Sequence, residues 1–168
     1  MVETPIEVQG LDTHEERKRA PEEKGNVVAR FCTYYMDEAV FQLPEVLEKA
    51  QKELADVDFD TLVGTGFSGG IIIPALALAM GKKFVLIRKE TDDSHHGKGE
   101  LLGDLGRRWI FVDDFIGSGR TRDRVISKIQ EAAEKRNMLT EMVGQYMYVE
   151  RIWGGGFFCP FDPAWVYE

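Results

Sequence analysis

The feature that most constrains this chain is an apolar run that ends in two carboxylates and a turn of small residues. Residues 109–112 (Trp-Ile-Phe-Val) are bulky and apolar, as expected for a strand buried on both faces. Asp113 and Asp114 follow, and a Gly/Ser/Thr loop then leads to a helix predicted to begin near Thr121. In an open parallel sheet, ligands bind in the crevice beyond the carboxyl ends of the strands. The stretch therefore predicts a sugar-phosphate site, with backbone amides for the phosphate and carboxylates for the sugar hydroxyls.

Strands and helices alternate along most of the chain. Apolar and β-branched runs predict strands, and apolar residues spaced three and four apart predict helices. The predicted strands cover 27–36, 60–63, 83–89, 108–112 and 142–150, and the predicted helices cover 43–55, 71–80 and 121–137. This alternation favours an α/β fold with a Rossmann-like parallel sheet flanked by helices on both faces.

The length of 168 residues suits a single domain, and we expect its core to span about 43–150. Residues 1–26 carry many charges and are predicted to be a partly flexible arm. Residues 151–168 are rich in glycine and aromatic residues and are a candidate hood over the site. The sequence does not decide which terminal segment forms that hood.

Charge and cysteine content exclude several classes of protein. The net charge of −8 argues against a nucleic-acid-binding or membrane-surface protein. The N-terminus has no secretory pattern, and the longest aliphatic run is too short to span a bilayer. Cys32 and Cys159 form no metal-type cluster, so a reducing, cytoplasmic setting is expected, although one disulfide between them stays open.

A second glycine-rich loop, residues 64–69 (Gly-Thr-Gly-Phe-Ser-Gly), matches the G-x-G-x-x-G pattern between a strand and a helix. Dinucleotide binding requires an acid about twenty residues further on, and Glu90 stands near that spacing. Arg88 and Lys89 precede it, however, and these cations suit a phosphate-rich ligand better than a ribose diol. A turn with a purely structural role is the remaining interpretation.

The loop after the acids is not a Walker A loop, because Asp114 and Arg120 stand where that motif has Gly and Lys. The apolar strand, acid pair and Gly/Ser/Thr turn resemble the phosphoribosyl pyrophosphate (PRPP) signature of type I phosphoribosyltransferases. The resemblance implies that Asp113 and Asp114 bind the ribose 2- and 3-hydroxyls. It also implies that the 5-phosphate is bound by Ile116, Gly117, Ser118, Gly119, Arg120 and Thr121.

The resemblance extends over about residues 61–150. The family has a short pyrophosphate loop after its first core strand, which corresponds here to Thr65, Gly66, Phe67 and Ser68. It also has a mobile catalytic lid before the PRPP strand, which here implies catalytic roles for Arg88, Lys89, His96 and Lys98. The Arg-Lys-Glu segment, the His-Gly-x-Gly core and a downstream Gly103 are most similar to the orotate branch.

Several positions depart from the family pattern. The orotate branch has a lysine where this chain has Asp92 and Asp93, and Lys98 is a shifted substitute. His95 is an extra histidine, so the sequence does not decide whether His95 or His96 belongs to the lid. Gly117 replaces the Asp with which the 6-oxopurine branch assists base deprotonation, so a 6-oxopurine enzyme is disfavoured while orotate and adenine stay open.

The resemblance implies transfer of a 5-phosphoribosyl group from PRPP to a nucleobase, in a homodimer, with Mg²⁺ held mainly by PRPP. A non-catalytic PRPP- or nucleotide-sensing regulator is the main alternative, and a dinucleotide-dependent oxidoreductase is a third. Aromatic residues of the tail belong either to the core or to a base-stacking surface, and these are Phe157, Phe158, Phe161 and Trp165.

Overall fold

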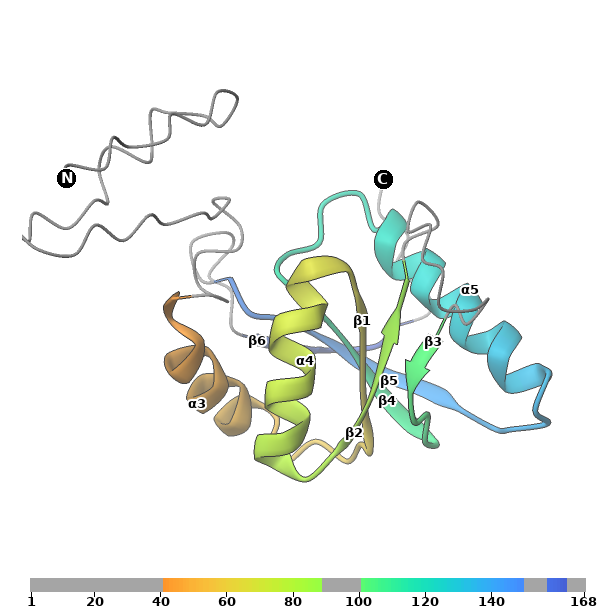
Figure 1. The fold of residues 1–168 in the computed structure, drawn as a ribbon, viewed down its shortest axis with the longest axis horizontal. Coiled ribbons are helices and arrows are strands. Elements are labelled where there is room, and N and C mark those ends of the chain that lie inside the picture. The colour runs from red at the N-terminus through yellow and green to blue at the C-terminus, as the bar shows by residue number, and fades with distance from the viewer. Residues whose placement is uncertain (1–40, 89–100, 150–156, 163–168) are drawn as a thin grey trace, which may run out of the picture. The chain divides into compact units, whose positions relative to one another are not determined.

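The computed structural model describes residues 41–88, 101–149 and 157–162 (Figure 1). Their three helices are α3 (Leu43–Glu53), α4 (Gly66–Met80) and α5 (Arg120–Glu134). Their strands are β1 (Thr61–Thr65), β2 (Lys83–Ile87), β3 (Leu101–Gly103), β4 (Arg108–Asp113), β5 (Glu141–Met147) and β6 (Phe157–Pro160). These strands form one sheet in the order β3-β2-β1-β4-β5-β6.

The four central strands run parallel, as the sequence predicts. β1 pairs with β2 and with β4, and β4 pairs with β5, all in parallel. Two antiparallel edge strands were not predicted: β3 pairs with β2, and β6 pairs with β5. The polar segment 90–108 lies between two predicted strands, and its composition predicts a long loop. Its residues Leu101–Gly103 instead form a strand, whose backbone groups pair with β2 at the sheet edge.

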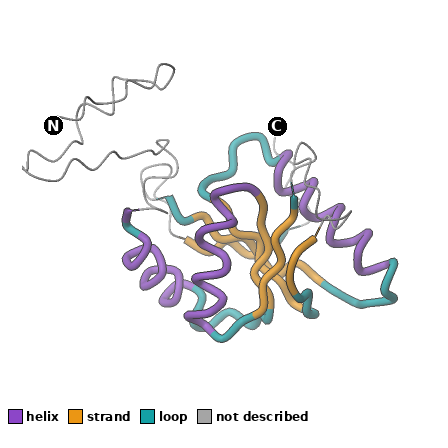
Figure 2. Tube along the Cα trace, in the orientation of Figure 1, coloured by secondary structure: helices purple, strands orange, loops and turns teal. Residues whose placement is uncertain are grey.

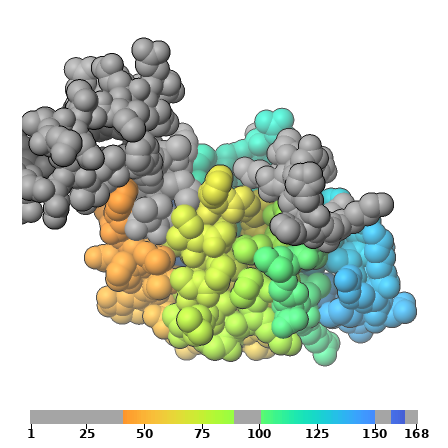
Figure 3. All heavy atoms as spheres, in the orientation of Figure 1, coloured from red at the N-terminus to blue at the C-terminus, as the bar shows by residue number. Residues whose placement is uncertain are grey.

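The central strands are buried on both faces, which explains why their residues form nearly continuous apolar runs. On one face Leu62, Ile110 and Tyr146 pack with the buried residues of α3 and α4. On the other face Val63 and Phe111 pack with the apolar stripe of α5. Figure 2 shows the sheet between these two helical layers, and Figure 3 shows α3 and α4 packed side by side.

The helix α4 begins five residues earlier than its apolar pattern predicts. Gly66 has φ of 71°, and this left-handed conformation turns the chain directly from β1 into the helix. The residues expected to form a loop over 64–70 are thus the end of β1 and the first turn of α4. Packing against the sheet overrides the weak helix propensity of these glycines. Gly81 ends the helix in the left-handed conformation that favours glycine.

The strand order reverses direction at β1. The chain passes from β1 through α4 to β2 on one side, and from β4 through α5 to β5 on the other. The crevice between the carboxyl ends of β1 and β4 is therefore the topological switch point, where open α/β sheets bind their ligands.

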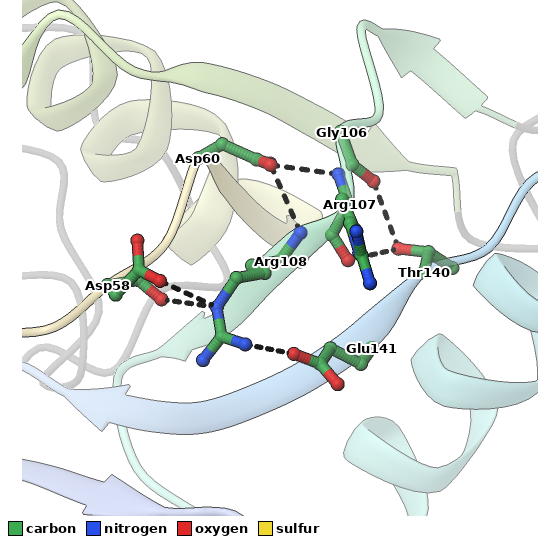
Figure 4. A network of polar contacts seen from close by, with 7 residues as sticks. All are labelled: Asp58, Asp60, Gly106, Arg107, Arg108, Thr140 and Glu141. Carbon is green, nitrogen blue, oxygen red and sulfur yellow. Dashed lines mark hydrogen bonds and ion pairs between the residues drawn. The ribbon is translucent and has the colours of Figure 1, made fainter.

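A polar network closes the opposite, amino-terminal edge of the sheet (Figure 4). The Asp60 carboxylate accepts hydrogen bonds from the backbone N–H groups of Arg107, at 2.8 Å, and Arg108, at 3.1 Å. The Arg108 guanidinium forms ion pairs with Asp58 and Glu141. Burial opposes ionisation of Asp60, but the hydrogen bonds from Thr61 and these amides outweigh it, and the pKa of Asp60 is lowered. The charged groups at this end of the sheet are thus paired with one another or with backbone amides of the same chain.

Several sequence predictions concern residues that the structure does not describe. They include the strand over 27–36, the arm over 1–26 and most of the hood over 151–168, and the single-domain division stays a prediction. None of the helices in the described part of the chain has the length and apolarity needed to cross a bilayer.

Gly64 is the tightest point of contact between β1, β4 and α4. A Cβ there would lie 2.6 Å from the Val112 carbonyl oxygen and 2.4 Å from Ile73 Cδ1. We expect Gly64→Ala to lower the free energy of unfolding by about 1–3 kcal/mol, because the sheet or α4 must shift. Urea denaturation measures this change.

Gly70→Ala is the matched control. Gly70 lies in the exposed first part of α4, and a Cβ there would meet nothing within 4 Å. The Gly70→Ala substitution should leave the free energy of unfolding unchanged or raise it by about 0.5–1 kcal/mol. Equal stability of the two variants would contradict the close packing at Gly64.

Candidate active site

Two neighbouring carboxylates stand at the carboxyl end of β4. Asp113 is the last residue of the strand and is 8% exposed, and Asp114 begins the loop that follows. Their backbone carbonyls accept hydrogen bonds from the N–H groups of Tyr148 and Val149, each at 3.2 Å. Pairing between β4 and the chain after β5 therefore continues past the strand and fixes the backbone of both acids.

The side chain of Asp113 ties β4 to the start of α4. The Ser68 hydroxyl donates a hydrogen bond to Asp113 Oδ1 at 3.0 Å, and the Asp114 N–H donates to the same oxygen at 3.1 Å. The Phe115 N–H donates to the Asp114 carboxylate at 2.9 Å. Each acid is thus held by donors from its own loop, and Ser68 joins the two parts of the site.

Burial raises the pKa of Asp113 to about 7, and the adjacent carboxylate of Asp114 adds to this effect. The hydrogen bonds from Ser68 and the Asp114 amide favour ionisation and offset only part of the shift. Asp113 therefore changes protonation near neutral pH, where an ordinary aspartate is fully ionised.

The N-termini of α4 and α5 lie at the same end of the sheet (Figure 1), and Ser68 of α4 and Thr121 of α5 line one cavity with the two acids. Neither helix has a side-chain hydrogen bond to its first turn. Thr65 precedes α4, but its hydroxyl donates to the Ile87 carbonyl at 2.7 Å and so serves the β1–β2 pairing. Gly119 precedes α5 with φ of 73°, a conformation that favours glycine. Uncapped amides and the helix dipoles make both positions favourable for anions.

A cavity of about 320 Å³ joins the acids and the two helix starts. Most of the residues predicted for the ligand line it, namely Thr65, Ser68, Asp113, Asp114, Ile116, Gly117, Ser118, Gly119 and Thr121. Its volume is at the lower end of the range for small-molecule sites. The two sequence motifs, 45 residues apart at Ser68 and Asp113, thus form one site.

Four other residues predicted for the site lie in the described part of the chain but do not line the cavity: Gly66, Phe67, Arg88 and Arg120. Phe67 is 85% exposed, and neither it nor Gly66 lines the cavity. The Arg120 Nε donates to the Ser118 hydroxyl at 3.1 Å, so this arginine supports the loop from outside. Arg88 follows β2 and is exposed. Lys89, His96 and Lys98 lie outside the described residues.

The aromatic residues of the tail divide between core and surface. Phe158 packs against the core on the α3–α4 face of the sheet, as the core interpretation predicts. Phe157 and Phe161 are partly exposed in and after β6, and Trp165 lies outside the described residues.

Sequence reasoning missed two residues of the cavity wall, Phe115 and Arg122. Phe115 lies inside the loop motif, between the acids and the predicted phosphate contacts. Arg122 is 7% exposed and stands on the stripe of buried α5 residues with Val125 and Ile129. Its spacing from Val125 and Ile129 places it on the buried face of the predicted helix. A charged residue on that face indicates a functional role, and this was the signal in the sequence.

The donor atoms at the site fit Mg²⁺ only together with a ligand. Among the described residues, no group of three or more histidine, cysteine or acidic side chains is placed to hold a metal ion. Mg²⁺ is commonly bound through one or two carboxylates and the phosphates of a substrate. Asp113 and Asp114 supply that number of carboxylates.

Comparison with known proteins gives a consistent picture. No family model matches the chain. An orotate phosphoribosyltransferase from Methanoculleus marisnigri is 28% identical over 138 residues, 71% of this chain and 80% of that protein. An adenine phosphoribosyltransferase from Solibacter usitatus is 30% identical over 103 residues, 52% of this chain and 59% of that protein. The chain thus spans less than two thirds of the length of this second relative.

Solved structures share the fold. Orotate phosphoribosyltransferase from Mycobacterium tuberculosis, in a complex with PRPP, matches with a TM-score of 0.52 at 15% identity, over 69% of this chain and 65% of that chain. The chain therefore shares the mostly parallel α/β fold of a solved phosphoribosyltransferase. Its curated relatives are orotate and adenine phosphoribosyltransferases, to which it is similar at modest identity.

The raised pKa of Asp113 predicts a pH dependence of stability. Because the folded protein binds this proton more tightly than the unfolded chain, ionisation destabilises the fold as pH rises from about 4 to about 7. Asp113→Asn removes this effect. Its free energy of unfolding relative to the wild type should therefore rise by up to about 1.4 kcal/mol per pH unit in that window and level off above it.

Urea denaturation at intervals of one pH unit measures this difference. Asp56→Asn, at an exposed position after α3, is the control and should follow the wild-type curve. A constant difference between Asp113→Asn and the wild type from pH 4 to pH 8 would show that Asp113 ionises as an ordinary aspartate.

Proposed function

We propose that this chain transfers the 5-phosphoribosyl group of PRPP to a nitrogenous base and releases pyrophosphate. One observation carries the proposal: two carboxylates stand between two uncapped helix N-termini in a single cavity. PRPP has the complementary order of groups, a ribose diol flanked by a phosphate on one side and a pyrophosphate on the other.

In this proposal the acid pair binds the ribose. Asp113 and Asp114 accept hydrogen bonds from the 2- and 3-hydroxyls, as the resemblance to the PRPP signature implies. The Asp113 carboxylate already accepts hydrogen bonds from Ser68 and from the Asp114 amide, so its orientation is fixed before the sugar arrives. Such preorganisation reduces the entropy lost on binding.

The start of α5 binds the 5-phosphate. Residues 116–119 and Thr121 line the cavity, and their backbone N–H groups with the exposed Ser118 and Thr121 hydroxyls are the donors that we assign to the phosphate. The helix dipole of α5 adds favourable charge at the same place. The loop thus recognises a phosphate by the chemistry of a helix N-terminus.

The start of α4 binds the pyrophosphate. Thr65 and Ser68 line the cavity there, and the first turn of α4 carries no acidic residue that would repel an anion. Arg88 follows the carboxyl end of β2 and brings positive charge to this side of the sheet, and the resemblance implies the same role for Lys89. Negative charge developing on the leaving group is stabilised by such fixed donors.

The reaction replaces one bond at the ribose C1 with another. The bond from C1 to the pyrophosphate oxygen breaks, its electron pair leaves with pyrophosphate, and a ring nitrogen of the base bonds to C1 and loses its proton to solvent. Positive charge builds on the sugar ring during this step, as in glycoside cleavage, and the carboxylates of Asp113 and Asp114 stabilise this charge. Mg²⁺, when bound with PRPP, supplies further charge neutralisation at the pyrophosphate.

The lid completes the proposal. By resemblance, the part of segment 90–108 that precedes β3 excludes water during the reaction, and His96 or Lys98 reaches the pyrophosphate oxygens. The rest of that segment lies in β3, in β4 and in the network around Asp60, so it is not part of the proposed lid. By the same resemblance, the protein is a cytoplasmic homodimer whose lids act across the interface.

The acceptor is orotate or a purine such as adenine. Gly117 lines the cavity but offers no carboxylate to a base, which disfavours 6-oxopurines. The curated relatives include enzymes named for orotate and for adenine. A non-catalytic regulator that binds PRPP is the alternative, and it uses the same cavity without turnover.

Neutralising both acids should abolish PRPP binding. Asp113→Asn with Asp114→Asn keeps the size of the side chains but replaces the charged acceptors of the ribose diol by neutral amides and removes the carboxylates for Mg²⁺. Isothermal titration with PRPP and Mg²⁺ should then detect no binding. The control pairs Asp56→Asn with Asp58→Asn, two exposed acids outside the cavity, and should bind as the wild type does. Unchanged affinity in the Asp113/Asp114 variant would contradict the assignment.

A panel of bases tests the reaction itself. The wild-type protein, PRPP and Mg²⁺ are incubated with orotate, adenine, hypoxanthine or guanine, and pyrophosphate release is measured. We expect release with orotate or adenine and none above background with the two 6-oxopurines. PRPP binding without release from any base would support the regulator, and failure to bind PRPP would reject both functions.

A further inference from the structure

A buried arginine forms part of the cavity wall beside the start of α5. Arg122 is 7% exposed, although arginine is rarely buried to this extent without a specific partner. It is the one cationic side chain among the described residues that line the cavity. The other charged residues of the described wall are Asp113 and Asp114.

The place of Arg122 on α5 explains how it reaches the site. The helix buries a stripe of residues at Arg122, Val125, Ile129 and Ala133. Val125 and Ile129 pack with Trp109 and Phe111 of β4. Arg122 lies one turn nearer the start of the helix, where the sheet ends and the apolar core gives way to the cavity.

The guanidinium is held in position from the solvent side. Its Nε and one terminal nitrogen donate to the same Asp123 oxygen, at 2.9 and 2.7 Å. The Asp123 side chain is 61% exposed, whereas that of Arg122 is 8% exposed. An exposed acid thus orients a buried cation at the N-terminus of α5, where the helix dipole already favours an anion.

Burying the charge of Arg122 removes water from the guanidinium and so lowers the free energy of unfolding, which an apolar residue at this position would not do. Replacing a buried ionic group by a well-packed apolar residue is often neutral or stabilising. Residues that lower stability in this way are concentrated at functional sites. The position of Arg122 on an otherwise apolar stripe is therefore better explained by a ligand than by packing.

We propose that Arg122 binds the 5-phosphate of the ribose together with the backbone amides of the 116–121 turn, and so selects a phosphorylated over an unphosphorylated sugar. This inference rests on the proposed function and names a specificity-determining residue for it. The phosphate is a dianion, and the backbone amides and the helix dipole offer it only partial positive charges. Arg122 adds a full positive charge. Guanidinium–phosphate contacts combine charge with directional hydrogen bonds.

The test compares Arg122→Met with the wild type by titration of ribose 5-phosphate and of ribose, and by thermal unfolding. Methionine suits the apolar stripe, so the midpoint of unfolding should stay the same or rise. Affinity for ribose 5-phosphate should fall by about tenfold or more, and the preference over ribose should fall equally. Arg122→Lys should give an intermediate affinity because it keeps the charge but not the forked geometry.

Arg124→Gln is the matched control, since Arg124 lies on the same helix but does not line the cavity. It should bind ribose 5-phosphate as the wild type does. If the wild type binds PRPP while Arg122→Met keeps its affinity for ribose 5-phosphate, the role of Arg122 is rejected and the proposed function stands. A lower unfolding midpoint with unchanged sugar preference would likewise make Arg122 a structural residue. If the wild type binds neither PRPP nor ribose 5-phosphate, both proposals fail.

Discussion

The burial of Asp113 at the end of β4 is the constraint on which the site depends. Both faces of β4 are covered by helices, so the strand delivers its last carboxylate into a place with little access to water. Ser68 of α4 and the Asp114 amide then hold this carboxylate at 3.0 and 3.1 Å. The same contact with Ser68 brings the glycine-rich segment 64–69 against the loop that follows the acids. One hydrogen-bonded acid thereby joins two helix N-termini into a single cavity.

The two ends of the sheet are built on opposite electrostatic principles. At the amino-terminal edge, Asp60 is surrounded by donors from its own chain and its pKa is lowered. At the carboxyl-terminal edge, burial raises the pKa of Asp113, the helix starts have no side-chain caps, and Arg122 occupies a core position. Asp113 and Arg122 line one cavity, and the two helix starts border it. Buried charged groups of this kind are more common at functional sites than in ordinary cores.

The proposed ligand explains why these unfavourable features occur together. A sugar phosphate with a second phosphate group offers hydroxyl donors to the acids and anions to the helix starts. Binding would add partners to those that the acids and Arg122 already have within the chain. The likeness to phosphoribosyltransferases, one of which is solved in a complex with PRPP, agrees with this account.

The strand–helix units, the parallel central strands and the acid pair could be predicted from the residues alone, because burial on both faces and helical spacing leave clear patterns. The contact between Asp113 and Ser68 could not, since the two residues are 45 positions apart and the sheet order that joins them is set by long-range packing. The tertiary structure also decided that α4 begins at Gly66, because packing on the sheet outweighs local propensity. The edge strands β3 and β6 are too short to leave a pattern. The place of Arg122 in the cavity wall likewise depends on where the helix passes the end of the sheet, which no local pattern records.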